Sequence, residues 1–163
     1  MKLKTDLTIK VGAGDLRTAS DICAALRQKG HRISGPANDI LDKPGFTVAG
    51  QEGDVGLMVV TTSELVGHDG WAKTTEVFTG AIRLGLEKCH HDDGLWLRQQ
   101  YLDQPPDEWL MIGMEPVDDS DGDLSVFGVG REGDVLHLTA NCANPNRRWE
   151  GDVRWVFRLP KSS

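Results

Sequence analysis

The spacing of apolar residues predicts mainly helices in the first two-thirds of the chain. Residues 7–11 alternate between apolar and polar, which is typical of a short strand. A helix should then begin at Thr18 or Ser20 and end at Gly30, because hydroxyl side chains cap helix starts and glycine favours the position after a helix end. A second, shorter helix is expected over 36–41.

The middle of the chain combines one strand with two longer helices. The run 55–61 is apolar and has the length of a strand that is covered on both faces. A helix is expected over 74–86, where apolar residues recur with helical spacing. Another helix is expected over 93–102, since the following Pro105-Pro106 cannot continue it.

After Pro106 the pattern changes to short strands that are separated by turn residues. The last strand alternates: Trp155 and Phe157 point to one face, whereas Arg154 and Arg158 point to the other face, which we expect to meet water. Short loops between successive strands favour an antiparallel meander. The four predicted strands lie at 109–115, 124–129, 135–140 and 153–159.

These elements predict an α+β fold, in which a helix-rich N-terminal two-thirds packs on a C-terminal antiparallel β-meander. The 163 residues have the length of one domain, and a candidate junction between sub-domains lies near 104–107. The C-terminal part alone, at about 60 residues, would have a marginal core, so we expect both parts to share one core.

Composition narrows the functional classes. The net charge of −7 argues against broad binding to phosphate backbones. No apolar run approaches the roughly 20 residues of a membrane span, and the N-terminus lacks the apolar core of a secretory signal. Three widely spaced cysteines, Cys23, Cys89 and Cys142, indicate neither a disulfide framework nor a cysteine zinc site. We therefore expect a cytoplasmic protein with no membrane partner and no cofactor.

Charge is divided unevenly between the middle and the end of the chain. Residues 99–130 contain eight carboxylates and neither Lys nor Arg. The tail reverses this sign and interleaves arginine with tryptophan, two residue types that are enriched at protein interfaces. The candidate partner-binding residues are Arg147, Arg148, Trp149, Arg154 and Arg158. The alternative interpretation is a sheet with solvated arginines on one face and buried tryptophans on the other.

Two alternative functions depend on residues elsewhere. A metal-dependent hydrolase could use His68, Asp69, His90, His91 and His137, although adjacent ligand types without zinc spacing are more typical of a solvated loop. A nucleic-acid binder could use a helix-turn-helix over 24–41. Its candidate contacts are Arg27, Lys29, Arg32 and Asn38. The acidic Asp39 and Asp42 would repel a phosphate backbone, which favours two packed helices without nucleic acid.

Several short stretches of the last half of the chain form a recurring pattern. They are Leu84-Gly85-Leu86-Glu87-Lys88-Cys89, Leu97-Arg98 through Tyr101, Asp103-Gln104-Pro105, Glu108-Trp109-Leu110, Met114-Glu115-Pro116, Asp119-Ser120-Asp121-Gly122 and Trp155-Val156-Phe157-Arg158. This pattern resembles small bacterial and mobile-element-associated proteins of unknown role. The resemblance implies a bacterial or phage context and brings no catalytic residues with it.

No catalytic residue is predicted, because the chain contains no G-x-S-x-G, H-E-x-x-H or Walker A motif. The leading hypothesis is a non-enzymatic protein-interaction module, acting as a small inhibitor, an immunity-type protein or an accessory protein. Its partner is expected to be a protein rather than a nucleic acid.

Overall fold

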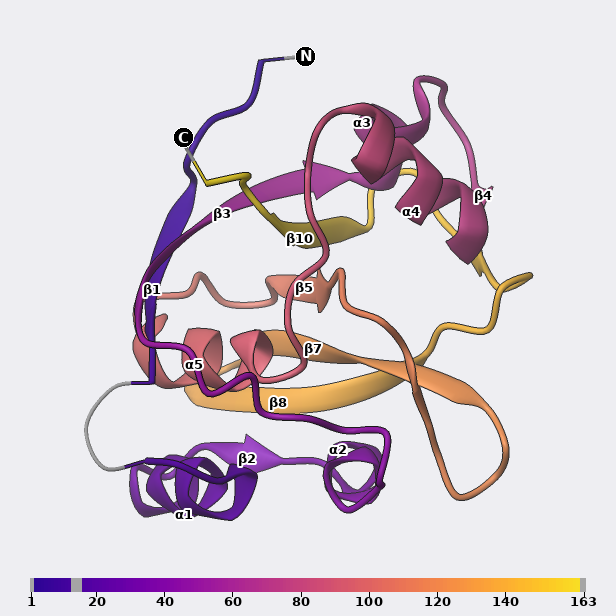
Figure 1. Cartoon of the computed structure of the whole chain (residues 1–163). Coiled ribbons are helices and arrows are strands. Elements are labelled where there is room, and N and C mark those ends of the chain that lie inside the picture. The colour runs from indigo at the N-terminus through magenta and orange to yellow at the C-terminus, as the bar shows by residue number, and fades with distance from the viewer. Residues whose placement is uncertain (1, 13–15, 162–163) are drawn as a thin grey trace.

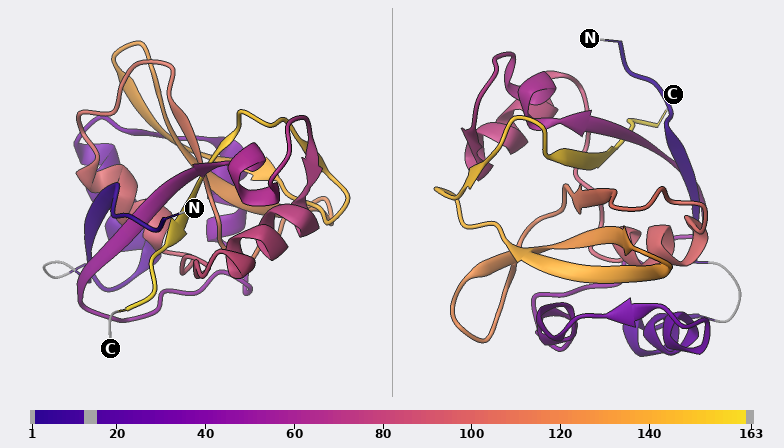
Figure 2. Two further views of the ribbon diagram at one scale, coloured as in Figure 1. Left: turned by 90° about the horizontal axis from the view of Figure 1, so that it is seen from above. Right: turned by 180° about the vertical axis from the view of Figure 1, so that it is seen from behind.

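The computed structural model describes residues 2–12 and 16–161, and most of these build or cover one curled sheet (Figures 1 and 2). Its strands are hydrogen-bonded in the order β1-β3-β10-β5-β7-β8-β2, and β6 pairs with β7 beside this path. A separate two-stranded sheet joins β4 to β9. The strands are β1 (Leu7–Val11), β2 (Arg32–Ile33), β3 (Gly53–Thr61), β4 (Ala72–Lys73), β5 (Trp109–Ile112), β6 (Val117–Asp118), β7 (Leu124–Glu132), β8 (Val135–Cys142), β9 (Arg148–Trp149) and β10 (Arg154–Arg158).

The helices divide between the inside and the outside of this curl. Helix α5 contacts β1 at one edge of the sheet and β7 and β8 near the other, so the sheet must curl to reach it. Figure 1 shows α1 and α2 beyond β8, and α3 and α4 at the opposite end of the molecule. The helices are α1 (Ala19–Gln28), α2 (Gly35–Leu41), α3 (Thr62–Val66), α4 (Thr74–Arg83) and α5 (Asp93–Gln100). None of them, within the described ranges, has the length and apolar character needed to cross a bilayer.

Strand β3 joins distant parts of the chain. Its first half pairs antiparallel with β1 and its second half with β10, so Leu57 lies opposite both Leu7 and Arg158. Strand β10 then pairs in parallel with β5, which places Trp155 opposite Met111. The sheet is therefore mixed, and the first and last strands of the chain are neighbours of the same strand.

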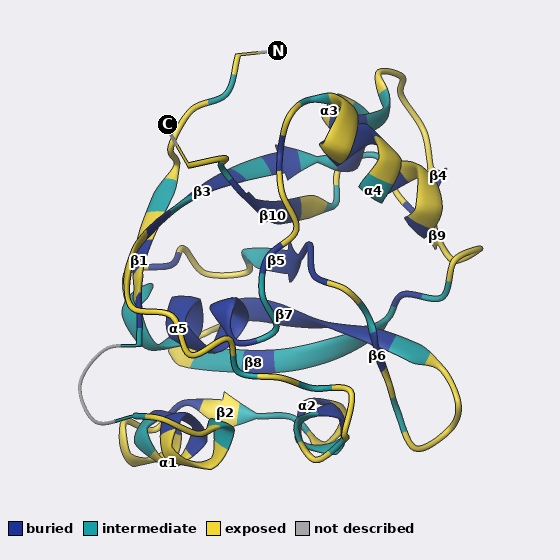
Figure 3. Ribbon diagram, in the orientation of Figure 1, coloured by how far each residue is buried: buried dark blue, intermediate teal, exposed yellow. Residues whose placement is uncertain are grey.

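Helix α5 is the centre of the core. Residues 93–98 of this helix are buried all the way round, as expected for a helix enclosed by a sheet (Figure 3). Trp96 and Phe127 are among the largest fully buried side chains. Arg98 is fully buried as well, and its guanidinium donates to the carbonyls of Tyr101, Gly130 and His137. The helix is thus fixed to β7 and β8 by apolar packing and by hydrogen bonds.

The predicted fold class is wrong. The structure is 32% strand and 25% helix, and its main element is the curled mixed sheet rather than a C-terminal meander beneath helices. Most of the predicted elements lie close to their expected ranges, as with β1 at Leu7–Val11 and α2 at Gly35–Leu41. The spacing of apolar residues did not show that β3 pairs with the first and the last strand of the chain. Such pairings depend on packing between distant segments, which periodicity does not encode.

Candidate functional site

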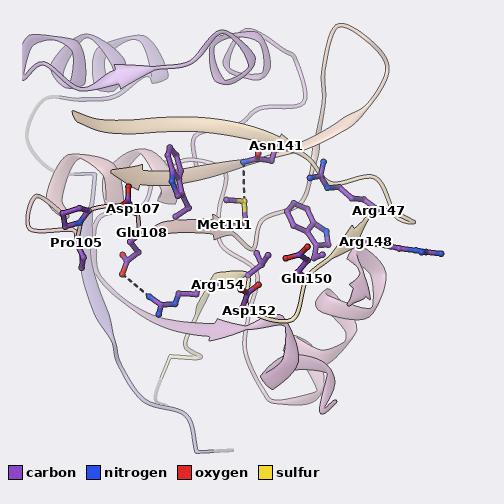
Figure 4. Close-up of a pocket in the computed structure, with 14 residues that line it drawn as sticks. Pro105, Asp107, Glu108, Met111, Asn141, Arg147, Arg148, Glu150, Asp152 and Arg154 are labelled. Atoms are coloured by element: carbon purple, nitrogen blue, oxygen red, sulfur yellow. Dashed lines mark hydrogen bonds and ion pairs between the residues drawn. The ribbon is translucent and has the colours of Figure 1, made fainter. Parts of the chain in front are cut away.

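A cleft of about 740 Å³ opens on the outer face of the sheet, turned away from α5 (Figure 4). The register of the strands identifies this face. Arg158 reaches α5 from β10, and Val156, two residues earlier on the same face, lies opposite Ile112 of β5. Trp109 and Met111 alternate with Ile112 along β5, so they point to the outer side. These two side chains and Asn141 of β8 form the floor of the cleft.

Two glycines of β7 leave room in this floor. Gly130 lies opposite Trp109, and Gly128 lies opposite Met111. A methyl group at Gly130 would overlap the indole of Trp109, and one at Gly128 would lie 3.2 Å from the Met111 Cε. The Trp109 indole and the Met111 thioether therefore lie directly on the backbone of β7, because no side chain of Gly128 or Gly130 stands between them and the strand. No helix of the described residues is built over this part of the sheet in Figure 1.

One wall of the cleft comes from β9, which is held by the small sheet with β4. Trp149 lies opposite Ala72, and its indole Nε1 donates to Thr74 Oγ1 over 2.8 Å. The Trp149 ring also packs edge-to-face on Trp155, with centroids 4.8 Å apart. The guanidinium of Arg147 lies over the Trp149 ring, 4.6 Å from its centroid. A buried tryptophan thus supports an exposed arginine at the edge of the cleft.

The neighbouring arginine makes a second pair of this kind. The Arg148 guanidinium lies 4.1 Å from the ring centroid of Trp71, a residue that is 47% exposed. Among the described residues, no carboxylate oxygen lies within 4.0 Å of a side-chain nitrogen of Arg147 or Arg148. We call Trp71, Arg147, Arg148 and Trp149 the Arg/Trp surface. It combines two uncompensated positive charges with aromatic rings on a chain of net charge −7.

The opposite wall is acidic and begins at Pro105-Pro106. Asp107 has a φ of 65°, a left-handed conformation that is costly for a residue with a side chain. Glu108 accepts hydrogen bonds from Arg154 over 3.4 Å and from Gln104 over 3.2 Å. Burial and a hydrogen bond with Glu108 raise the pKa of Tyr101 to about 12. This wall is therefore fixed by its own contacts, and Arg154 is one of them.

Arg158 does not reach the cleft, although it belongs to the predicted partner-binding set. It is 6% exposed and donates to both carboxylate oxygens of Asp93 in α5, over 2.6 and 2.8 Å. Burial works against its charge, but the hydrogen bonds and the charge of Asp93 outweigh burial and raise the pKa of Arg158. The expected water-facing side of β10 instead meets α5 at this position. Four of the five predicted residues, Arg147, Arg148, Trp149 and Arg154, line the cleft.

The predicted metal ligands are not brought together. In residues 2–12 and 16–161, one group of side chains has the spacing of a metal site: His90, Asp92 and Asp93, with ligand atoms within 4.8 Å of one another. Its carboxylates are already engaged, because Asp93 binds Arg158 and Asp92 accepts from Trp96 Nε1 over 2.9 Å. The other four predicted ligands lie outside this group: His68, Asp69, His91 and His137.

The segment predicted as a helix-turn-helix has a different structure. Arg32 and Ile33 between its helices form strand β2, which pairs in parallel with His137 and Leu138 of β8. Asn38, the expected base-reading residue, accepts a hydrogen bond from Arg27 over 2.7 Å. Arg27, Lys29 and Arg32 are exposed, but the two helices are joined through an edge of the main sheet rather than through a turn.

Sequence reasoning missed most of the cleft, and it missed Trp71 of the Arg/Trp surface. Trp71, Trp109, Met111 and Asn141 were not among the candidate residues, and they come from separate segments. Trp71 and Trp109 each closely follow acidic residues in the sequence, but only the pairings β4–β9 and β5–β10 place them beside the arginines of the tail.

Comparisons with known proteins add no family to this description. No model of a protein family, no curated protein and no solved structure matches the chain.

Proposed function

We propose that this protein is a non-enzymatic interaction module that binds another protein through the Arg/Trp surface and the adjoining cleft. The observation that carries this proposal is the pair Arg147 and Arg148. Each guanidinium lies over a tryptophan ring and has no carboxylate partner among the described residues. Arginine and tryptophan are the residue types that contribute most to binding energy at protein interfaces.

The energetics of these pairs favour a role in binding over a role in folding. A cation–π contact at an exposed site contributes only about 0.5–1 kcal/mol. The same contact restricts the guanidinium, so the arginine side chain would lose less entropy when a partner binds it. Arg147 and Arg148 are exposed, while the ring of Trp149 beneath Arg147 is buried. The surface is therefore preorganised by the fold without contributing much to its stability.

The acidic wall supports binding rather than catalysis. Glu108, the least exposed carboxylate of the cleft, is held by Arg154 and Gln104. A general acid or base has to reach the reacting atoms of a substrate, and these contacts hold the Glu108 carboxylate against the protein's own side chains. A role as an inhibitor, an immunity-type protein or an accessory protein in the cytoplasm of a bacterium, or of a phage-infected cell, is the form of this proposal that we favour.

The test is capture of a partner with matched charge-reversal variants. The tagged protein is incubated with a lysate of the cells that encode it, and bound proteins are quantified by mass spectrometry. Arg147→Glu/Arg148→Glu reverses both positive charges of the Arg/Trp surface and leaves its two tryptophans in place. Arg32→Glu/Arg83→Glu makes the same change in net charge at two other exposed arginines that have no ion pair within the described part of the chain.

We expect at least one protein to be retained by the wild type and by the control, and to be lost with the first variant. That protein is then purified, and its dissociation constant is measured with all three chains. A partner that binds all three equally, or no partner at all, would contradict the proposal.

A further inference from the structure

We infer that the cleft beside the Arg/Trp surface takes an extended segment of the partner protein, and that an Asp or Glu side chain of this segment binds Arg147 and Asn141. This inference rests on the proposed function, because it names the part of the partner that the surface recognises. Three properties of the cleft lead to it: the spacing of the floor, an unused donor and the placement of charge.

The floor has the spacing of an extended chain. Trp109 and Met111 are alternate residues of β5, so their side chains are separated by about 7 Å along the strand. Alternate side chains of an extended peptide have the same separation and could therefore meet the two residues in turn. The volume of about 740 Å³ lies in the range of pockets that enclose a ligand. An extended backbone is the occupant that matches the period of this floor.

Asn141 supplies a donor that the fold leaves almost unused. Its side-chain Nδ2 donates to the Met111 Sδ over 3.4 Å. A thioether sulfur is a weak acceptor, so the amide gains little from this contact. A carboxylate oxygen would be a much stronger acceptor for the same group. The position of Asn141 in the lining of the cleft lets a ligand reach it.

The charges of the lining residues favour an acidic side chain of the bound segment at the Arg147 end of the cleft. Figure 4 shows Arg147 and Asn141 on the same side of the cleft, Asp107 at the far end, and the carboxylates of Glu150 and Asp152 also in the lining. Arg147 lacks a carboxylate partner among the described residues, whereas Arg154 already binds Glu108. A basic side chain at the Arg147 end would be repelled, and an acidic one would form a charge-assisted hydrogen bond. Asp107, Glu150 and Asp152 repel an acidic side chain elsewhere in the cleft, which leaves the Arg147 end as the place where such a side chain is favoured.

The experiment is selection of peptides from a displayed library of random sequences of about twelve residues, the length of an extended recognition segment. Wild-type protein, Arg147→Glu, Arg147→Met and Arg83→Glu are immobilised in parallel. Arg147→Met keeps an apolar side chain over Trp149 and removes the charge together with the N–H donors of the guanidinium. Thermal melting of each variant, compared with the wild type, shows which variants remain folded.

We expect the wild type and Arg83→Glu to select peptides with Asp or Glu at one recurrent position. Arg147→Met should bind these peptides about tenfold more weakly, and Arg147→Glu should select Lys or Arg instead. Binding should weaken as salt rises from about 0.05 to about 0.5 M, because the Debye length falls below the distance over which an exposed pair interacts. Asn141→Leu should weaken the selected peptides without changing the preferred charge.

Selection without acidic enrichment, no selection at all, or acidic enrichment that persists on Arg147→Glu would overturn the inference. These results leave the proposed function separately testable. If a partner protein is captured through the Arg/Trp surface but acidic peptides are not selected, the interaction module stands and the extended acidic segment is excluded. If peptides are selected but no partner is captured, the proposed function fails by its own test.

Discussion

Arginines of the C-terminal segment have opposite environments, although they lie within a dozen residues of one another. Arg158 is 6% exposed and is neutralised by Asp93, whereas Arg147 and Arg148 lie on tryptophan rings at the surface without a carboxylate partner among the described residues. The same residue type therefore serves two purposes. Arg158 fixes β10 to α5 inside the curled sheet, whereas the surface pair is exposed to solvent.

Arg98 extends the comparison to a buried arginine without a carboxylate. Its guanidinium is held by backbone carbonyls and by Gln104 Oε1 at 2.7 Å, and burial lowers the pKa of Arg98 to about 10. Burying a charge is costly unless hydrogen bonds compensate it, and Arg98 relies on its two terminal nitrogens because its buried Nε has no partner among the described residues. Both buried arginines therefore depend on the partners that they have. The surface pair has no such dependence. This difference predicts that the inner arginines control stability and the outer ones control binding.

The largest expected effect follows from removing the partner of Arg158. Asp93→Ala leaves a buried guanidinium unpaired, and the free energy of unfolding should fall by about 3–5 kcal/mol. Urea denaturation followed by tryptophan fluorescence measures this change. The double variant Asp93→Ala/Arg158→Met should recover part of the loss, because it removes the unpaired charge. No recovery in the double variant would show that the ion pair is not the reason for the loss.

Arg98→Met should have the next largest effect. It removes an unfavourably buried charge but leaves the carbonyls of Gly130 and Tyr101 and the Gln104 side chain without their donor. The net loss in the free energy of unfolding should be about 2 kcal/mol, measured by the same denaturation. Arg98→Lys should lose a similar amount, since an ammonium cannot reproduce the planar fork of donors. Wild-type stability in either variant would mean that the buried hydrogen bonds do not hold α5.

The environments of these arginines could be predicted only in part. The alternation of the last strand correctly places Arg154 and Arg158 on one face, apart from Trp155. Which face meets water could not be read from it, because both faces of β10 are covered from Trp155 to Arg158 and Arg154 alone in the strand is exposed. Helix α5 lies on one side, and Phe78 of α4 packs on Trp155 on the other. When both faces of a strand are buried, its sequence does not indicate on which face an arginine will be paired with a carboxylate, as Arg158 is with Asp93.

The candidate site was predictable to a similar degree. The interleaving of Arg and Trp in the tail identified Arg147, Arg148 and Trp149, which line the cleft. Its floor was not identified, because Trp109 and Asn141 are brought there by the pairing of β5, β7 and β8. Trp71 reaches Arg148 through the two-residue strands β4 and β9, which are too short to show a period.

A smaller effect, on pH dependence, is expected from the buried His31. Burial lowers the pKa of His31 below its usual value, and the charges of Arg98 and Lys29 lower it further. The unfolded chain therefore binds a proton at His31 more readily than the folded protein does, so stability should be constant above the unfolded pKa of about 6.5 and should decrease as the pH falls below it. His31→Gln removes this contribution. Urea denaturation at a series of pH values should show a shallower decrease for the variant, and parallel curves would contradict this role.

The smallest effect on stability is expected at the Arg/Trp surface, and there it can be compared directly with binding. For Arg147→Glu/Arg148→Glu, the free energy of unfolding and the affinity for the captured partner are measured on the same preparation. We expect the free energy to change by about 1 kcal/mol, since two exposed cation–π contacts of about 0.5 kcal/mol each are lost. The affinity should fall about a hundredfold, as for the loss of central arginines from an interface. A variant that unfolds, or one that binds the partner as tightly as the wild type, would show that these arginines do not form a binding surface separate from the fold.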